Sequence, residues 1–265
     1  MPARNKPLIE ELEILYKKFN DRQHRSSDPI QFAYRYQQSE DIEIAALISA
    51  LFAYGNVKSM CAAIEKIMTF LGERPFHRLR EMDSKTLKKD LPLIYYRFFT
   101  TEDIHHLLLT LSEILKREGS LKNCMQQSWN KSNGNLLDCL FDFREKFVNS
   151  FKTSPGLKFM FPHPKQGAAK RLHMFMRWMI RSDEVDLGIW NFIPASALIV
   201  PLDTHVFKAA RRLRFTRRKT PSLQAALEVT QALKRLSPED PLKYDFALCH
   251  SGMRIAKSRS KALLG

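Results

Sequence analysis

Glycine is scarce in this sequence, and the cysteines stand far apart. Only 9 of the 265 residues are glycine, and the apolar runs are rarely β-branched, which argues against Gly-rich phosphate loops, sandwiches and barrels. No CxxC pair occurs, so we expect no zinc knuckle, no four-cysteine iron–sulfur loop and no other metal site. Four thiols in so long a chain do not form a disulfide scaffold, which favours a reducing cytoplasm. They belong to Cys61, Cys124, Cys139 and Cys249.

Long apolar segments are missing as well. The longest extends from residue 44 to residue 54, is interrupted only by Ser49, and is too short to cross a bilayer. Acidic residues arrive by Glu10 with no apolar stretch before them, so we expect no signal peptide. These absences predict a cytoplasmic protein without a membrane partner.

Positive charge is abundant, and acid is in short supply. Lys and Arg number 43 against 28 Asp and Glu, which gives a formal net charge of +15. The apolar fraction of 44% is enough for a core and too high for disorder. A chain this basic is expected to meet a polyanion, of which nucleic acid is the commonest.

Apolar residues recur with helical spacing nearly throughout the chain, which predicts an all-α fold. Residues 72–100 look looser, and residues 152–167, with three prolines and two glycines, predict a long loop. We expect one unit over residues 1–265 with two lobes and a cleft between them, one lobe at 30–150 and the other at 151–265 together with the N-terminal helix. Helices are expected from Leu8 to Phe19, after Asp28-Pro29, and at about 41–54, 57–71, 101–117, 135–151, 168–181, 203–213, 221–235 and 241–256.

The helix expected from residue 168 has two different faces. Apolar residues repeat on one face, and the opposite face is cationic, which is usually a solvated arrangement. Lys170 differs from the other cations because it stands in the first turn, where the positive end of the helix dipole opposes an ammonium. A lysine in such a place is a candidate amine nucleophile. The cationic face comprises Lys170, His173, Arg177 and Arg181.

Asp203, in the segment PLDTH, is expected to be the N-cap of the next long helix. A carboxylate held by helix-end amides stays ionised and can stabilise a cationic sugar transition state. A helix over 168–181 is about 20 Å long, and the turn and connector at 182–202 can bring the chain back along it. The spacing therefore permits Lys170 and Asp203 to meet, each at the start of a helix.

A run of seven cations in twelve residues follows, with no acid among them. A solvated face normally mixes both signs of charge, so a cluster of one sign favours phosphate contact. The run comprises Lys208, Arg211, Arg212, Arg214, Arg217, Arg218 and Lys219.

Two segments carry a family resemblance. FPHPKQGAAKRLHMFMRWMIRSDEVDLGIW and LIVPLDTHVFKAARRLRF closely resemble an uncharacterised bacterial family of conserved hypothetical proteins that carries a domain of unknown function. AALISALFAYGN near residue 50 and DPLKYDFALCHSG near the end fit the same family, so the resemblance covers nearly the whole chain. Membership of such a family implies no activity.

A second, more distant resemblance implies chemistry. PLDTHVFKAARRL is similar to the segment of helix-hairpin-helix DNA glycosylases in which the Asp is catalytic, and Asp203 matches that position. Bifunctional members carry an attacking Lys at the second helix of the hairpin, which Lys170 matches. The usual hairpin L-P-G-V-G-x-K is replaced by P-H-P-K-Q-G-A-A-K, and the iron–sulfur loop of the endonuclease III branch is absent. The spacing of 33 residues between Lys and Asp is nearer to the archaeal 8-oxoguanine glycosylase branch.

The resemblance implies a DNA glycosylase, bifunctional with AP lyase activity or monofunctional, that excises a damaged base such as 8-oxoguanine from duplex DNA. Such a protein would be a nucleoid-associated monomer with no cofactor, no iron–sulfur cluster and no protein partner. Lys170 would form a Schiff base with the sugar, assisted by Asp203. The base pocket would include Asp245, Met174 and Cys249, while Thr204 and His205 would support the site. Phosphates would be held by Lys165, Gly167 and Arg171, and by Lys208, Arg211, Arg212, Arg214, Arg217 and Arg218.

Two other functions stay open at this point. A non-catalytic nucleic-acid-binding protein could have the same fold and the same basic surface. A helical enzyme that acts on RNA also agrees with the sequence. Covalent trapping on damaged DNA separates the first alternative from the glycosylase, and competition between RNA and duplex DNA tests the second.

Overall fold

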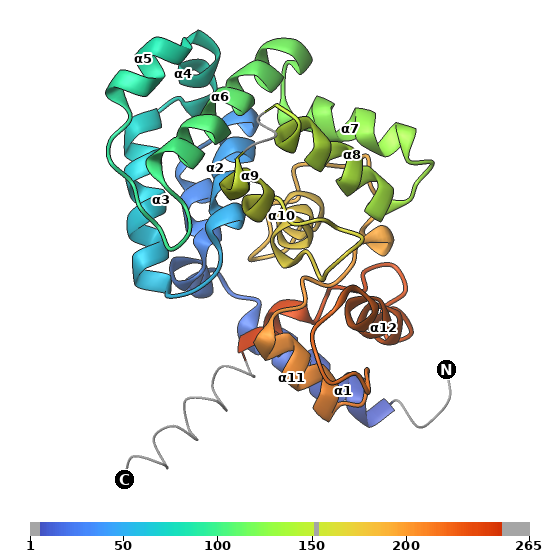
Figure 1. The fold of residues 1–265 in the computed structure, drawn as a ribbon. Helices are drawn as coiled ribbons and strands as arrows, with labels where there is room; N and C mark the ends of the chain where they lie inside the picture. Colours follow the sequence, from blue (N-terminus) through green and yellow to red (C-terminus); the bar gives the residue numbers. More distant parts are fainter. Residues whose placement is uncertain (1–5, 151–153, 251–265) are drawn as a thin grey trace. The chain divides into compact units, whose positions relative to one another are not determined.

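The computed structural model describes residues 6–150 and 154–250, which fold into helices and connecting segments (Figure 1). No β-strand occurs in these ranges, which contain only two isolated β-bridges, so the predicted all-α class is confirmed. The chain divides into two compact units. We call residues 27–164 the central unit, and residues 1–26 together with 165–265 the terminal unit. None of the helices in the described ranges is long and apolar enough to span a membrane.

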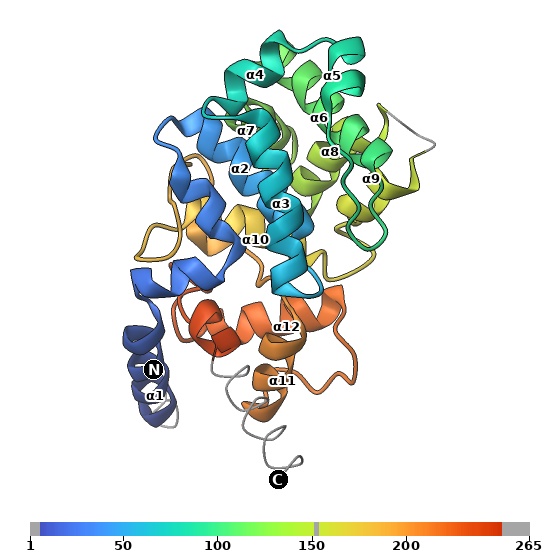
Figure 2. The same ribbon diagram turned by 90° about the vertical axis from the view of Figure 1, so that its left-hand side faces the viewer.

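The central unit is built around helix α2 (Ser39–Phe52), which packs against neighbours on most of its sides (Figures 1 and 2). Eleven of its 14 residues are buried, as its nearly continuous apolar sequence predicts. Its neighbours are the 3-10 helix η3 (Pro29–Arg35), α3 (Val57–Leu71), α4 (Pro75–Glu81) and α7 (Leu121–Lys131). The unit also contains α5 (Ser84–Asp90), α6 (Thr101–Glu118), α8 (Leu136–Val148) and α9 (Pro155–Met160).

Two segments of this unit were not predicted to be helical. Residues 72–100 are not simply loose, because they contain α4 and α5, and α7 was not predicted. The aspartates beside the two short helices explain them: Asp41 Oδ1 accepts the Phe76 amide of α4 at 2.7 Å, and Asp83 caps α5. A helix of seven residues has fewer than two full turns, so its apolar periodicity is too short to read from sequence.

The boundary between the units also differs from the expected one. We expected the second lobe to begin at residue 151, whereas the central unit extends to Pro164. The predicted loop at 152–167 contains α9, in which Ser154 is the N-cap and Pro155 the first helical residue. Ser154 Oγ also donates to Asp103 Oδ1 of α6 at 3.1 Å, and α9 packs against α6 and α8. These contacts attach α9 to the central unit.

The terminal unit contains the elements of the candidate site. Its helices are α1 (Lys6–Phe19), α10 (Lys170–Ile180), α11 (Thr204–Arg212) and α12 (Leu223–Lys234), with short 3-10 helices η2 (Arg22–Ser27) and η4 (Ala195–Ala197). Residues 245–250 are also helical, whereas 241–244, where we expected that helix to begin, form a turn, and residues 251–256 lie outside the described residues. Helix α1 is attached through Glu13 Oε1, which accepts from Lys243 Nζ at 2.5 Å and from the Tyr244 hydroxyl at 2.6 Å.

Candidate active site

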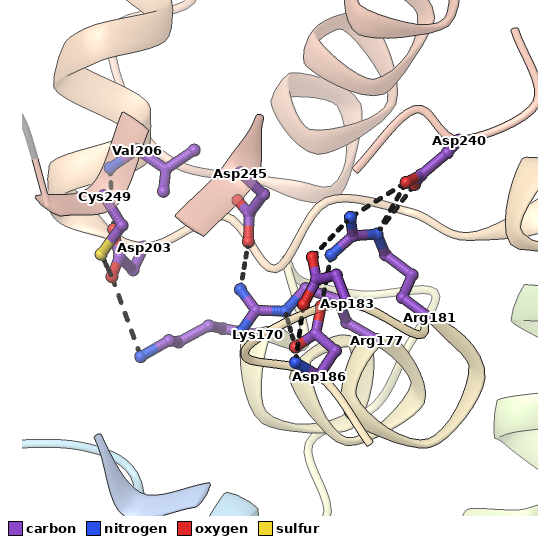
Figure 3. Close-up of polar contacts among 10 residues, drawn as sticks. All are labelled: Lys170, Arg177, Arg181, Asp183, Asp186, Asp203, Val206, Asp240, Asp245 and Cys249. Carbon is purple, nitrogen blue, oxygen red and sulfur yellow. Dashed lines mark hydrogen bonds and ion pairs between the residues drawn. The ribbon is translucent and has the colours of Figure 1, made fainter. Parts of the chain in front are cut away.

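Helix α10 is buried along its whole length from Arg171 to Ile180. The expectation that its cationic face is solvated was therefore wrong: Arg177 and Arg181 are each only 4% exposed. Buried guanidinium groups require carboxylate partners, because the desolvation of an unpaired charge is prohibitive. Four aspartates supply these partners, as Figure 3 shows.

The two arginines share these aspartates in one network. Arg177 Nε lies 3.1 Å from Asp186 Oδ1, and Arg177 Nη1 lies 2.6 Å from Asp245 Oδ2. Arg181 pairs with Asp186 as well, and its Nε lies 2.8 Å from Asp240 Oδ1. Its Nη2 also lies 3.0 Å from Asp183 Oδ2. The network therefore joins α10 to the turn that follows it and to residues 240–245.

Burial and charge shift the acid–base properties of this network in opposite directions. Burial raises the pKa of Asp186 to about 6, although Arg177 and Arg181 act to lower it. Burial likewise raises the pKa of Asp245 against the opposing effect of Arg177. For Arg181, burial lowers the pKa, but the carboxylates around it outweigh that effect and the net direction is upward. Arg181 thus stays charged.

A tight turn after α10 reverses the chain toward the start of that helix. The amides of Leu187 and Gly188 both donate to the Trp178 carbonyl, at 2.9 and 3.1 Å. Gly188 has a φ of +61°, and a Cβ there would lie 2.5 Å from the Cβ of Ser182, so this position requires glycine. The connector that follows is held to α12, where the Val200 amide donates to Thr230 Oγ1 at 3.0 Å.

This path brings Lys170 and Asp203 together. Lys170 Nζ lies 3.9 Å from Asp203 Oδ2, with the two side chains 32% and 18% exposed (Figure 3). Asp203 is the N-cap of α11, as its sequence predicts, and its Oδ1 accepts the amides of His205 and Val206 at 2.8 Å each. Because Oδ1 serves the cap, Oδ2 is the oxygen that faces the amine.

The residue before Lys170 has an unusual backbone. Ala169 is the N-cap of α10, with φ of 40° and ψ of 39°, and its side chain forms no cap hydrogen bond. An alanine in the left-handed region is strained, and such strain often accompanies functional sites. The helix therefore begins at Lys170 without the side-chain cap that α11 receives from Asp203.

A thiol completes this arrangement. Cys249 Sγ lies 3.5 Å from Asp203 Oδ2, so Cys249, which was assigned to the base pocket, contacts the catalytic candidate itself. Burial raises its pKa well above 9, and the Asp203 and Asp245 carboxylates act in the same direction while Lys170 opposes them. The side chain is therefore a neutral thiol that can donate a hydrogen bond.

The other residues assigned to the pocket and its support lie in varied surroundings. Asp245 and Met174 are buried, with 1% and 6% of their surface exposed, and Asp245 is bonded to Arg177. Asp245 Oδ1 has no hydrogen-bond partner among the described residues. Thr204 is exposed, and His205 is half-buried. For Asp245 and Met174 to contact a base, the residues that bury them would have to move.

The residues assigned to phosphate binding near α10 differ from one another. Lys165 is exposed, and Gly167 is half-buried with open space where a Cβ would stand. Arg171 is buried with 9% of its surface exposed, so it does not present its guanidinium on the surface described here. The phosphate contacts of all three stay predictions.

The basic run on and after α11 is exposed at every position. Arg218 Nε pairs with Glu228 Oε1 of α12 at 2.8 Å, a contact that the local sequence did not predict. Within the described residues the other six cations have no carboxylate within 4 Å. Lys and Arg number 25 in the terminal unit against 12 Asp and Glu, whereas the central unit has 18 against 16. The positive charge is thus concentrated in the unit that contains Lys170 and Asp203.

Comparison with known proteins identifies a family whose function is unknown. A protein-family model described as a protein of unknown function (DUF2400) matches residues 28–254. The match includes the candidate site and leaves helix α1 outside it. No curated protein and no solved structure matches the chain.

Proposed function

The chain belongs to the DUF2400 family of unknown function, and from that premise we propose that it is a DNA glycosylase with AP lyase activity. Its substrate would be duplex DNA with a damaged base such as 8-oxoguanine. The observation that carries the proposal is the distance of 3.9 Å between Lys170 Nζ and Asp203 Oδ2, two groups separated by 33 residues and each at the start of a helix. The similarity of PLDTHVFKAARRL to the catalytic segment of helix-hairpin-helix glycosylases supports the same roles.

Lys170 is the nucleophile in this reaction. Its neutral amine attacks C1′ of the damaged nucleotide, and the bond from C1′ to the base breaks with its electron pair leaving on the base, which is then protonated. Opening of the C1′–O4′ bond gives a Schiff base between C1′ and Nζ, with a proton added to O4′. Loss of a proton from C2′ then expels the 3′ phosphate, which is the lyase step. The nucleotide must first be extruded from the duplex.

Asp203 Oδ2 accepts the proton that the amine loses on attack. The atoms are 3.9 Å apart, which is beyond hydrogen-bond reach, so transfer requires a small approach or one bridging water. Oδ1 is held by two amides, and this fixes the direction of Oδ2. A carboxylate in this position also stabilises positive charge on the sugar.

The basic run supplies the affinity for DNA. Six exposed cations without carboxylate partners in the described chain are available for phosphates, which bind them without sequence preference. Their affinity for duplex DNA would be strongly salt-dependent, since phosphate neutralisation releases counterions.

Borohydride trapping tests the proposal. Protein is incubated with duplexes that carry 8-oxoguanine or an abasic site, reduced, and analysed for a covalent adduct. We expect an adduct with the wild type, none with Lys170→Ala, and a rate reduced about 100-fold or more with Asp203→Asn, which keeps an N-cap acceptor. Lys89→Ala, at an exposed position of α5, is the matched control and should trap like the wild type. An adduct that survives Lys170→Ala contradicts the assignment of the nucleophile.

A non-catalytic nucleic-acid-binding protein is the second candidate. The observation that favours it is that Asp203 already has a structural role as the cap of α11 through Oδ1, so the ion pair of its Oδ2 with Lys170 also has a purely structural explanation. This function predicts salt-sensitive DNA binding that Lys170→Gln leaves unchanged, with no base released from any lesion tested.

A further inference from the structure

Two groups approach the oxygen of Asp203 that the helix cap leaves available. Oδ1 accepts the amides of His205 and Val206, whereas Oδ2 lies 3.9 Å from Lys170 Nζ and 3.5 Å from Cys249 Sγ. The carboxylate is therefore shared between a cation and a thiol (Figure 3). The proposed reaction uses the cation and leaves the thiol without a role.

A buried ion pair determines where this thiol stands. Cys249 is one helical turn after Asp245 within the helical residues 245–250, so the two side chains share a face. Arg177 is two turns after Lys170 on α10 and shares a face with it in the same way. Arg177 Nη1 lies 2.6 Å from Asp245 Oδ2, and this contact holds the two helix faces together. It thereby brings Cys249 to the same end of α10 as Lys170.

The charged groups that face Cys249 come from three segments. They are Lys170 of α10, Asp203 at the start of α11, and Asp245 on its own helix. Burial and the two carboxylates raise the pKa of the thiol, so it donates a hydrogen bond and does not act as a thiolate nucleophile. A sulfhydryl is a weak donor, but it points here at a charged acceptor.

We propose that Cys249 is a positioning residue whose S–H donates to Asp203 Oδ2 and makes that oxygen a weaker base toward Lys170. The catalytic meaning of this contact rests on the proposed glycosylase function. With the donor present, Asp203 stabilises the ammonium form of the lysine less strongly, and the neutral amine forms at lower pH. Without the S–H donor, Asp203 Oδ2 stabilises the ammonium of Lys170 more strongly, so Lys170 loses its proton at higher pH.

Two measurements on the full-length protein, each made as a function of pH, test this role. One is the rate of borohydride trapping on an abasic-site duplex. The other uses no DNA: acetic anhydride labels amines, and mass spectrometry of the peptide that contains Lys170 gives the pH of half-maximal labelling. The variants are Cys249→Ala and Cys249→Val, which lack a donor, and Cys249→Ser, which keeps one. Cys61→Ala in the central unit is the matched control for loss of a thiol.

We expect both pH midpoints to rise by about half a unit in Cys249→Ala and Cys249→Val, as for the loss of one weak hydrogen bond to a charged group. Cys249→Ser and Cys61→Ala should keep the wild-type midpoints. A purely structural role would lower the amplitude of trapping in all three Cys249 variants without moving the midpoint. Thermal unfolding of each variant shows which of the two apolar replacements folds well enough to be compared.

Midpoints that do not move in either apolar variant overturn the role of Cys249. So does a shift in Cys249→Ser as large as that in Cys249→Ala. A wild-type protein that forms no adduct at any pH overturns the proposed function instead. The labelling midpoints then still decide whether the thiol contact acts on Lys170, because they need no catalysis.

Discussion

Arg177 and Asp245 form an ion pair with 2.6 Å between Nη1 and Oδ2, and the two side chains are only 4% and 2% exposed. Breaking such a pair leaves a buried charge without its partner, which typically costs about 3–5 kcal/mol. We therefore expect Asp245→Ala to lower the free energy of unfolding by about that amount in denaturant titrations. Asp186 still contacts Arg177 in this variant, so we expect the loss at the lower end of that range.

Glu65→Ala provides the comparison for this prediction. Glu65 pairs with Arg35 at 2.7 Å, but the two side chains are 49% and 42% exposed. A solvated pair contributes about 0–1 kcal/mol, so this variant should unfold almost like the wild type. Equal losses in the two variants would show that burial does not determine the contribution of the Arg177–Asp245 pair.

The close packing of Gly156 against α6 leaves no room for a side chain at this position. A Cβ on this first-turn residue of α9 would lie 2.0 Å from the Asp103 carboxyl carbon, which is itself held by Thr100 and Ser154. Gly156→Ala forces α9 away from α6 and should lower the free energy of unfolding by about 1–3 kcal/mol. Gly167→Ala is the matched control, since nothing stands within 4 Å of the added Cβ. A Gly156→Ala protein as stable as Gly167→Ala would refute the close approach.

His173 predicts a loss of stability in acid. The ring is fully buried in α10, and burial lowers its pKa from 6.5 to about 4. Between these values the unfolded chain binds more protons than the folded chain, so the free energy of unfolding falls as the pH falls. The largest effect of this group is about 3 kcal/mol, reached below pH 4.

His173→Leu isolates this effect. Asp186 acts in the opposite direction, because its raised pKa of about 6 lets the folded chain bind more protons than the unfolded chain down to about 3.8. Both proteins share that contribution, so it cancels in the difference between them. In denaturant titrations from pH 7 to pH 4, the free energy of unfolding of the variant should rise steadily relative to that of the wild type below pH 6.5. A constant difference would mean that His173 is not buried as a neutral ring.

The basic run predicts the salt dependence of DNA binding. Changing three of its arginines to glutamine should reduce the slope of log affinity against log salt by about two to three units, roughly one for each lost phosphate contact. Three exposed lysines of α5, in the nearly neutral central unit, form the control set and should leave the slope unchanged. An equal change in both sets would show that the basic run is no special contact surface. The sets are Arg211, Arg212 and Arg214, and Lys85, Lys88 and Lys89.

The longer helices could be predicted because each carries its own signals. The expected helix at 57–71 coincides with α3, in which Asn56 accepts the Ser59 amide as N-cap. Asp203 was expected to cap α11 and does so. The short helices α4, α5 and α9 were missed, because six or seven residues give too little periodicity. Pro75 of α4 and Pro155 of α9 also read as loop signals.

The candidate site could be predicted only in part. The approach of Lys170 to Asp203 was expected from two helix starts and a connector of sufficient length, and the structure has them 3.9 Å apart. The cationic face of α10 was expected to be solvated but is buried. The helical spacing of its arginines does not show whether water or buried aspartates surround them. The thiol of Cys249 gave no local signal, since its partner is 46 residues away.

The sequence by itself determined the helical class, the excess of positive charge and the residues that begin the long helices, since composition, periodicity and caps act over a few neighbouring residues. The tertiary structure alone decided which charges are buried and which carboxylates neutralise them. Arg177 meets Asp245 across 68 residues, and Asp203 meets Cys249 across 46. Pairings over such separations depend on how the turn after α10 and the connector to α11 fold back, and no local pattern encodes that path.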